Sequence, residues 1–139
     1  MVEQGSLVEF DPSAPIWVQL VSEFARRIVV GEWAPGSKVP GVRELAADLG
    51  VNPNTAQRAL AELERQGLCR SERTAGRFVT DNPERIDAER AALSQEAADE
   101  FISRAQGFRM PLRHAQQLIS ERWAAHADHD HDRAGAEGA

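Results

Sequence analysis

Two absences narrow the class of this chain before any motif is considered. Its 139 residues contain one cysteine, Cys69, so an internal disulfide framework is excluded and a reducing compartment is expected. The apolar runs are too short to span a membrane, and residues 1–6 lack the basic and apolar regions of a signal peptide. We therefore expect a cytoplasmic protein with no membrane partner, in which Cys69 is a small core side chain.

Motifs for catalysis are also absent from the sequence. It contains no glycine-rich phosphate loop, no nucleophile beside a base and no carboxylate pair in a plausible cleft. The His and Asp side chains of residues 126–132 are metal-ligand types, but they lie near the end of the sequence among Ala and Gly, without a rigid scaffold. We expect the protein to have no catalytic activity, no cofactor and no metal site. A metal-responsive regulator that uses the His and Asp residues of 126–132 stays an alternative.

Basic residues are outnumbered, and their distribution matters more than the total. The formal net charge is −6. Residues 81–139 hold 7 Lys/Arg and 12 Asp/Glu, which gives −5 of that charge, whereas residues 38–80 hold 7 basic and 5 acidic side chains. Because salt screens exposed charges beyond about 8–10 Å, a local basic face can bind phosphate even in an acidic chain.

The apolar periodicity predicts a mostly α fold with a small β-hairpin. Helical spacing of apolar residues indicates helices over 15–30, 42–49 and 53–66. Two short strands follow, over 68–73 and 77–80, joined by a tight bend at Gly76. Three helices followed by a hairpin form the winged helix-turn-helix. We expect Trp17 and Trp33 as core aromatics, and Arg65 and Arg70 as surface charges with partners such as Glu62 or Glu72.

The stretch from Gly50 to Arg58 is the most informative part of the sequence. Asn52 can cap a helix that starts at Pro53, whose missing N–H would be unpaired at that position anyway. The first turns of that helix then carry hydrogen-bonding side chains: Asn54, Thr55, Gln57 and Arg58. A helix that enters a DNA major groove needs donors at its N-terminal end, so this stretch predicts the turn and recognition helix.

A second, wholly helical unit is expected after the break at 81–83. The predicted organisation is a flexible lead-in at 1–12, a DNA-binding domain at 13–81, two helices at 84–126 and a disordered tail at 127–139. Two helices cannot enclose a core alone, so their apolar residues predict a homodimer. The expected dimerisation residues are Leu93, Ala97, Phe101, Ile102, Leu112, Ala115, Ile119 and Trp123.

Five ordered segments of the chain resemble the GntR family of bacterial transcription regulators. They are residues 15–20 (PIWVQL), 31–40 (GEWAPGSKVP), 42–46 (VRELA), 51–59 (VNPNTAQRA) and 63–68 (LERQGL). The likeness runs nearly without gaps from residue 14 to 80. The short helical part that follows is similar to the YtrA-like subfamily, whose tail of about two helices serves dimerisation, and it is too short for the ligand-binding domains of larger subfamilies.

The resemblance implies a role in DNA contact for ten residues. Arg43 would contact a phosphate or a guanine edge. Asn52, Asn54 and Thr55 would hold the DNA backbone or nearby bases, and Gln57 and Arg58 would face the groove. The wing would place Arg73, Thr74, Gly76 and Arg77 at the adjacent minor groove. The sequence departs from the family pattern at Gly41, where a serine is common, and in the wing at Ala75 and Arg77.

The expected function is that of a bacterial transcription regulator, most simply a repressor. A homodimer would place two recognition helices in the two half-sites of a pseudo-palindromic DNA operator. Analogy with the subfamily suggests control of its own operon, often one for an ABC-type transporter. No small-molecule effector can be named from the sequence, and a winged-helix module that binds proteins stays an alternative.

Overall fold

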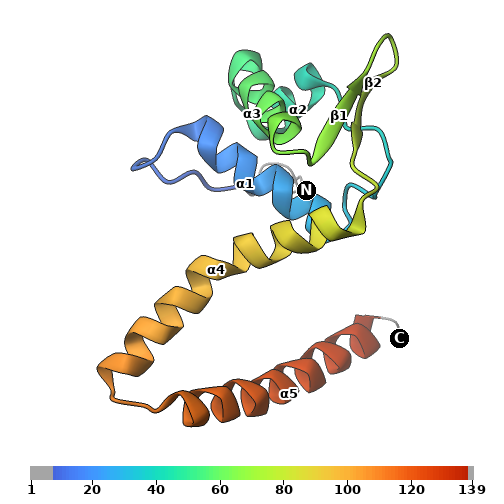
Figure 1. The fold of residues 1–139 in the computed structure, drawn as a ribbon. Helices are drawn as coiled ribbons and strands as arrows, with labels where there is room; N and C mark the ends of the chain where they lie inside the picture. The colour runs from blue at the N-terminus through green and yellow to red at the C-terminus, as the bar shows by residue number, and fades with distance from the viewer. Residues whose placement is uncertain (1–7, 138–139) are drawn as a thin grey trace. The chain divides into compact units, whose positions relative to one another are not determined.

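The computed structural model describes residues 8–137, and the side chains of residues 8–129 (Figure 1). Within that range the chain forms five helices and one antiparallel hairpin, which confirms the predicted mostly helical winged fold. The elements are α1 (Ile16–Val29), α2 (Val42–Leu49), α3 (Pro53–Arg65), β1 (Cys69–Glu72), β2 (Gly76–Val79), α4 (Pro83–Gly107) and α5 (Leu112–Glu137).

The turn between α2 and α3 forms as its residues predict. Gly50 ends α2 in the left-handed conformation, with φ of 67°, which a residue without a Cβ adopts at little cost. Asn52 then caps α3, because its side-chain Oδ1 accepts a hydrogen bond of 2.8 Å from the backbone N–H of Asn54. Pro53 occupies the first helical position.

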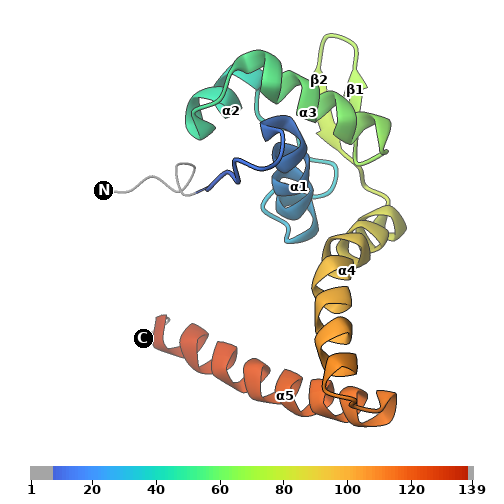
Figure 2. The ribbon, with the colours of Figure 1, turned by 90° about the vertical axis from the view of Figure 1, so that its left-hand side faces the viewer.

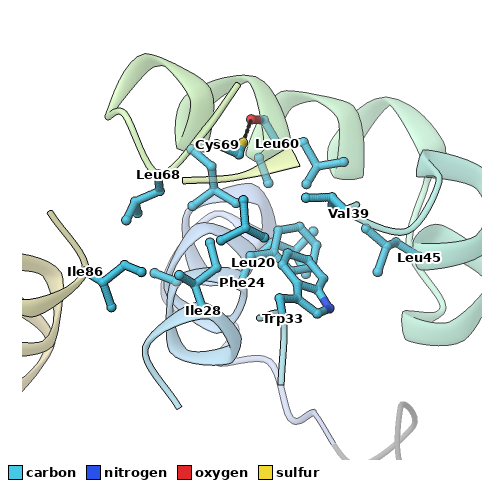
Figure 3. Close-up of a cluster of buried hydrophobic side chains, with 14 of the residues drawn as sticks. Leu20, Phe24, Ile28, Trp33, Val39, Leu45, Leu60, Leu68, Cys69 and Ile86 are labelled. Carbon is cyan, nitrogen blue, oxygen red and sulfur yellow. Dashed lines mark hydrogen bonds between the residues drawn. The ribbon is translucent and has the colours of Figure 1, made fainter. Parts of the chain in front are cut away.

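One apolar core holds the three helices and the hairpin together (Figure 3). Leu20, Phe24 and Ile28 of α1 are at most 1% exposed and face the buried side of α3. Trp33 stacks on Phe24 with ring centroids 5.2 Å apart, which confirms it as a core aromatic. Cys69 is also buried, and desolvation raises the pKa of its thiol to about 11, as suits a structural side chain.

The wing has a third backbone segment that the sequence did not predict. Residues 36–39 pair with the free edge of β2, where the amide of Val39 donates to the carbonyl of Arg77 at 2.8 Å and the amide of Val79 donates to Ser37 at 2.9 Å. Lys38 lies opposite Phe78 in a β-bridge. The turn expected at 34–37 is therefore followed at once by a strand-like segment that braces the hairpin.

The structure divides the chain within α4, with a first unit up to Ser94 and a second from Gln95. This division lies about a dozen residues after the predicted boundary at 81–83. Ile86 is 7% exposed and joins the first core, and Leu93 packs against that core as well. Both lie on one face of α4, two turns apart, and a hydrogen bond of 2.8 Å from Arg90 to the carbonyl of Val29 fixes that face to α1. Leu93, which is expected at the dimer interface, is half-buried and packs against the core of the first unit.

Both ends of the described range are more ordered than predicted. Val8 and Phe10 pack against the first core, within the segment expected to be a flexible lead-in, while residues 1–7 lie outside the described residues. At the other end α5 continues to Glu137, although disorder was expected from 127. None of the described helices has the length and apolar character to span a bilayer.

Candidate nucleic-acid interface

Helix α3 presents one buried and one exposed face. Its buried side carries Ala56, Ala59, Leu60 and Leu63, each 0% exposed. The exposed side carries residues with polar and basic side chains, including Asn54, Gln57 and Arg58, and Thr55 is half-buried beside them. Figures 1 and 2 show α2, α3 and the hairpin along one side of α1. The predicted recognition helix therefore packs against the core with one face and leaves the opposite, polar face exposed.

The N-terminal end of α3 is a favourable place for an anion. Asn52 satisfies one free backbone N–H of the first turn, and both Asn52 and Asn54 are exposed. The N–H groups of Thr55 and Ala56 also donate to the carbonyl of Asn52, so the helix macrodipole is what favours negative charge here. Arg43 is the second residue of α2 and is exposed as well. These residues are typical of a phosphate-binding edge.

In the wing, the predicted DNA-contact residue Arg77 is engaged in an ion pair within the protein. The guanidinium of Arg77 forms an ion pair of 3.3 Å with Glu64 of α3, and its side chain is only 17% exposed. Ser71 of β1 also donates a hydrogen bond to Glu64. The Ser71 hydroxyl has the largest effect and lowers the pKa of Glu64; burial raises it, and the hydrogen bond and charge of Arg77 lower it further, so that the pKa lies below its ordinary value. Arg77 therefore joins the wing to α3, whereas Arg73 and Thr74 at the hairpin tip are exposed as expected.

Lys38 is a candidate that the sequence analysis missed. It is exposed, and its side chain lies along the wing, so that a Cβ at Gly76 would be only 2.8 Å from its Cε. Gly76 itself has φ of 112°, a conformation that glycine favours. No local signal in the sequence marks Lys38 as part of the wing, because its place follows from the pairing of residues 36–39 with β2.

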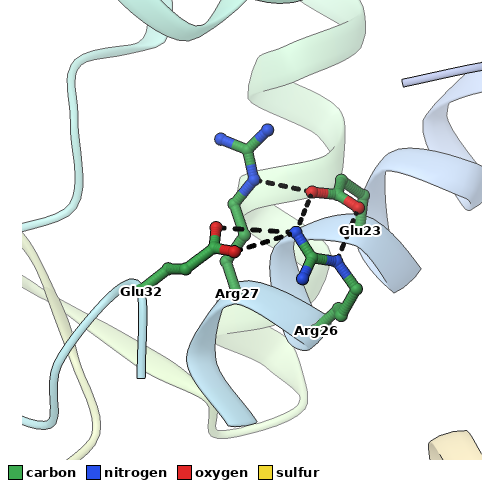
Figure 4. A network of polar contacts seen from close by, with 4 residues as sticks. All are labelled: Glu23, Arg26, Arg27 and Glu32. Carbon is green, nitrogen blue, oxygen red and sulfur yellow. Dashed lines mark hydrogen bonds and ion pairs between the residues drawn. The ribbon is translucent and has the colours of Figure 1, made fainter. Parts of the chain in front are cut away.

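Ion pairs neutralise most cationic side chains of the first unit. Figure 4 shows one network, in which Arg26 pairs with Glu23 at 3.0 Å and with Glu32 at 3.3 Å, and Arg27 pairs with Glu23 at 2.7 Å. Further pairs join Arg65 to Glu62, Arg70 to Glu72, Arg77 to Glu64, Arg85 to Glu89 and Arg90 to Asp87. The predicted partners of Arg65 and Arg70 are thus confirmed.

Four cations of the first unit have no carboxylate partner within the described residues. They are Lys38, Arg43, Arg58 and Arg73. Three of them are predicted DNA-contact residues, and the fourth lies on the wing. These unpaired cations therefore lie in α2, in α3, in the turn of the hairpin and in the segment that pairs with β2.

The second unit carries apolar side chains that its own two helices leave exposed. Phe108, Leu112 and Trp123 are 79%, 74% and 73% exposed, and Ile102 and Ile119 are 48% and 45% exposed. Ala97 is exposed, Phe101 is half-buried, and Ala115 is 9% exposed. Phe101, Ile119 and Trp123 line a hollow of about 680 Å³, and Ala97 and Phe101 line a second of about 400 Å³.

The metal alternative receives no support from the described side chains. No group of three His, Cys, Asp or Glu side chains comes together within residues 8–129 as a metal site would require. His126 and His129 lie on α5, and the remaining members of the His and Asp run have side chains outside the described ones.

Known proteins share both the sequence and the fold of the chain. A family model described as bacterial regulatory proteins, gntR family, matches residues 18–79. The uncharacterised HTH-type regulator YhcF of Bacillus subtilis is 37% identical over 94 residues, which cover 68% of this chain and 78% of that protein. The transcriptional repressor YtrA of the same organism is 37% identical over 78 residues, 55% of this chain and 60% of the relative.

Solved structures agree with this assignment. A GntR family transcriptional regulator from Listeria monocytogenes matches with a TM-score of 0.71 and 33% identity, over 81% of this chain and 98% of that one. A transcriptional regulator from Oenococcus oeni matches with a TM-score of 0.69 and 20% identity, over 84% and 98%, and shows the fold alone. The chain therefore belongs to the gntR family of bacterial regulatory proteins, and it is a winged helix-turn-helix transcriptional regulator of the DNA-binding type.

Proposed function

We propose that the chain binds a pseudo-palindromic DNA operator as a homodimer and represses transcription from the cytoplasm. The observation that supports DNA binding most strongly is the set of four described cations of the first unit that have no carboxylate partner: Lys38, Arg43, Arg58 and Arg73. Neutralisation of phosphates by Lys and Arg supplies most of nonspecific DNA affinity. YtrA, to which the chain is similar, is named a repressor, and repression comes to this chain by that likeness.

In this proposal α3 enters the major groove with its N-terminal end leading. Asn54, Gln57 and Arg58 reach base edges from the exposed face, while Asn52 and Arg43 lie at the phosphate backbone. Amide side chains pair well with adenine, and a guanidinium pairs well with guanine. Phosphate contacts then fix the register, and the base contacts supply sequence preference.

The wing follows the same strand of phosphates into the adjacent minor groove. Arg73 and Thr74 are exposed at its tip, and Lys38 lies beside Gly76. The ion pair of Arg77 with Glu64, which joins the wing to α3, supports a different role for this residue. We therefore assign Arg77 to the geometry of the wing and Lys38 to the phosphate contacts.

The homodimer rests on the apolar surface of the second unit. Phe108, Leu112 and Trp123 are each more than 70% exposed, and a monomeric protein rarely leaves so many large apolar side chains in water. A second copy of the same helix pair would cover them, because a two-fold interface joins a patch to itself. The dimer also supplies the two recognition helices that a palindromic operator requires.

DNA binding is tested by selecting duplexes from a random library with the full-length protein and titrating the selected duplex at several salt concentrations. We expect a recurring inverted repeat, and an affinity that falls steeply as salt rises. A library that yields no enriched sequence, or binding that does not respond to salt, would favour the protein-interaction module instead.

Dimerisation is tested with Trp123→Glu, matched by Ala124→Glu on the same helix. Trp123 lines the larger hollow, whereas Ala124 is an exposed residue that lines neither hollow. We expect light scattering to report a monomer for Trp123→Glu and a dimer for Ala124→Glu. Removal of residues 84–139 is a poorer test, because it also deletes Ile86 and Leu93 from the first core. A dimer that survives Trp123→Glu would place the interface elsewhere.

A further inference from the structure

Arg58 of α3 is held by an aromatic ring from α1. Its guanidinium carbon lies 4.0 Å from the centroid of the Trp17 ring. The two other cation–π contacts within the described residues, of Arg27 with Trp33 and of Arg70 with Phe78, have distances of 5.8 and 5.7 Å.

Arg58 also differs from those two arginines in what else it touches. Arg27 and Arg70 each have a carboxylate partner, Glu23 and Glu72 respectively. No ion pair or side-chain hydrogen bond is formed by Arg58 with any described residue. Among the described residues, the indole is therefore the one group that has a polar or cation–π contact with this guanidinium.

Trp17 occupies this place because of how α1 packs. It is the second residue of α1, and Leu20 and Phe24 in the following turns are fully buried in the core. The neighbours of Trp17 in the chain, Ile16 and Val18, are 45% and 41% exposed, whereas Trp17 is half-buried. The expectation that Trp17 is a core aromatic is wrong, since the half-buried ring belongs neither to the core cluster nor to the side chains packed against it, and Arg58 lies over it instead.

A stacked guanidinium keeps its hydrogen-bonding capacity. The five N–H donors of arginine lie in the plane of the group, so they point past the ring edge when one face rests on an indole. Stacking also restricts the arginine side chain to fewer rotamers before DNA binds, so less conformational entropy is lost on binding. Preorganisation of this kind improves affinity without any new contact. A lysine would not gain the same benefit, because its ammonium is a strongly hydrated point charge.

We propose that Trp17 is a positioning residue for operator recognition, which fixes the Arg58 guanidinium for base or phosphate contact without touching DNA itself. This inference rests on the proposed function and extends the reading surface to the first turn of α1. The opposite arrangement is a resting lock, in which the ring holds Arg58 away from DNA. The two hypotheses predict opposite changes in DNA affinity. Removal of the Trp17 ring weakens binding if the ring positions Arg58, and strengthens binding if the ring locks it.

The test is a double-mutant cycle in the full-length protein, titrated against the duplex selected with the wild type. Trp17→Leu is expected to weaken binding about fivefold, equivalent to about 1 kcal/mol. Arg58→Ala is expected to weaken it further, and adding Trp17→Leu to Arg58→Ala should cost nothing more. Trp17→Phe keeps a ring and should retain most of the affinity.

Three outcomes would overturn the inference. They are equal losses from Trp17→Leu in the presence and absence of Arg58, an unchanged affinity for Trp17→Leu, or a gain in affinity. Salt-dependent binding by the wild type in the same titration supports the proposed function whichever of these is found, and its absence would remove both proposals.

A second readout needs no DNA and separates positioning from a structural role. In a Trp123→Phe background the emission of the free protein comes from Trp17 and the buried Trp33. Arg58→Ala removes the group that covers the Trp17 ring, so iodide should quench the emission more strongly. Gln57→Ala, next to Arg58 on α3, serves as the control and should leave quenching unchanged. Equal quenching with and without Arg58 would contradict the stack.

Discussion

The asparagine that caps α3 offers a way to separate stability from DNA binding. Asn52 accepts a hydrogen bond of 2.8 Å from the amide of Asn54, and its side chain is exposed at the edge proposed to face phosphate. Asp and Asn cap helices equally well, and a negative charge also interacts favourably with the N-terminal end of the helix dipole. Asn52→Asp should therefore keep the fold and place a carboxylate where DNA is expected.

The expected magnitudes follow from these interactions. Asn52→Ala should cost about 1 kcal/mol of stability, or about 4–8 °C in the melting temperature of a unit of this size. Asn52→Asp should leave that temperature unchanged or slightly higher. Two like charges about 6 Å apart repel by about 0.7 kcal/mol in water and about 2.8 kcal/mol at an effective dielectric constant of 20. Affinity for the selected duplex should then fall about threefold to a hundredfold.

The chain provides a matched control at the start of α4. Asn82 precedes Pro83 as Asn52 precedes Pro53, and its Oδ1 accepts a hydrogen bond of 3.0 Å from the amide of Glu84. Asn82→Ala should lower the melting temperature to a similar extent, and Asn82→Asp should change neither stability nor affinity. Calorimetry and mobility-shift titration at fixed salt check both pairs. An Asn52→Asp variant that binds the duplex as tightly as the wild type would refute the placement of α3.

Three further results are expected. Arg43→Ala should weaken binding to the selected duplex and reduce its salt slope by about one, with unchanged melting, since it removes one phosphate contact; an unchanged slope would argue against that contact. Gly76→Val should strain the backbone at φ of 112° and cost about 1–2 kcal/mol, measured by urea unfolding. Burial raises the pKa of Glu23, but hydrogen bonds from Arg26 and Arg27 outweigh it and leave the pKa below its ordinary 4.5. Its stabilisation is therefore complete above pH 4.5 and lost as the pH falls through the lowered value, and Glu23→Gln should flatten that part of the stability curve.

The local parts of the fold could be predicted from sequence because their signals are short-ranged. Gly50, Asn52 and Pro53 specify the end of one helix and the start of the next within four positions, and the structure forms both as expected. The ion pair between Arg65 and Glu62 follows the same logic, since residues three apart on a helix are neighbours.

The features that the sequence analysis did not foresee depend on contacts between distant segments. Arg77 and Glu64 are thirteen residues apart, and nothing in either neighbourhood indicates that they pair. Leu93 fits the apolar period of α4 equally well whether that face packs on the first core or on a second chain. Lys38 becomes a wing residue only because residues 36–39 pair with the free edge of β2.

The overall acidity of the chain is compatible with a DNA-binding surface because of where its carboxylates lie. Glu23 and Glu64 do not oppose binding at a distance, since each is engaged with arginines of its own unit. These ion pairs neutralise cations of α1 and of the wing. Arg43 and Arg58 have no such partner among the described residues, so their charges are available to bind phosphate. Within the first unit, the described cations that the carboxylates leave unpaired thus coincide with the surface proposed to bind DNA. Net charge contains no such information, because it counts paired and unpaired side chains alike.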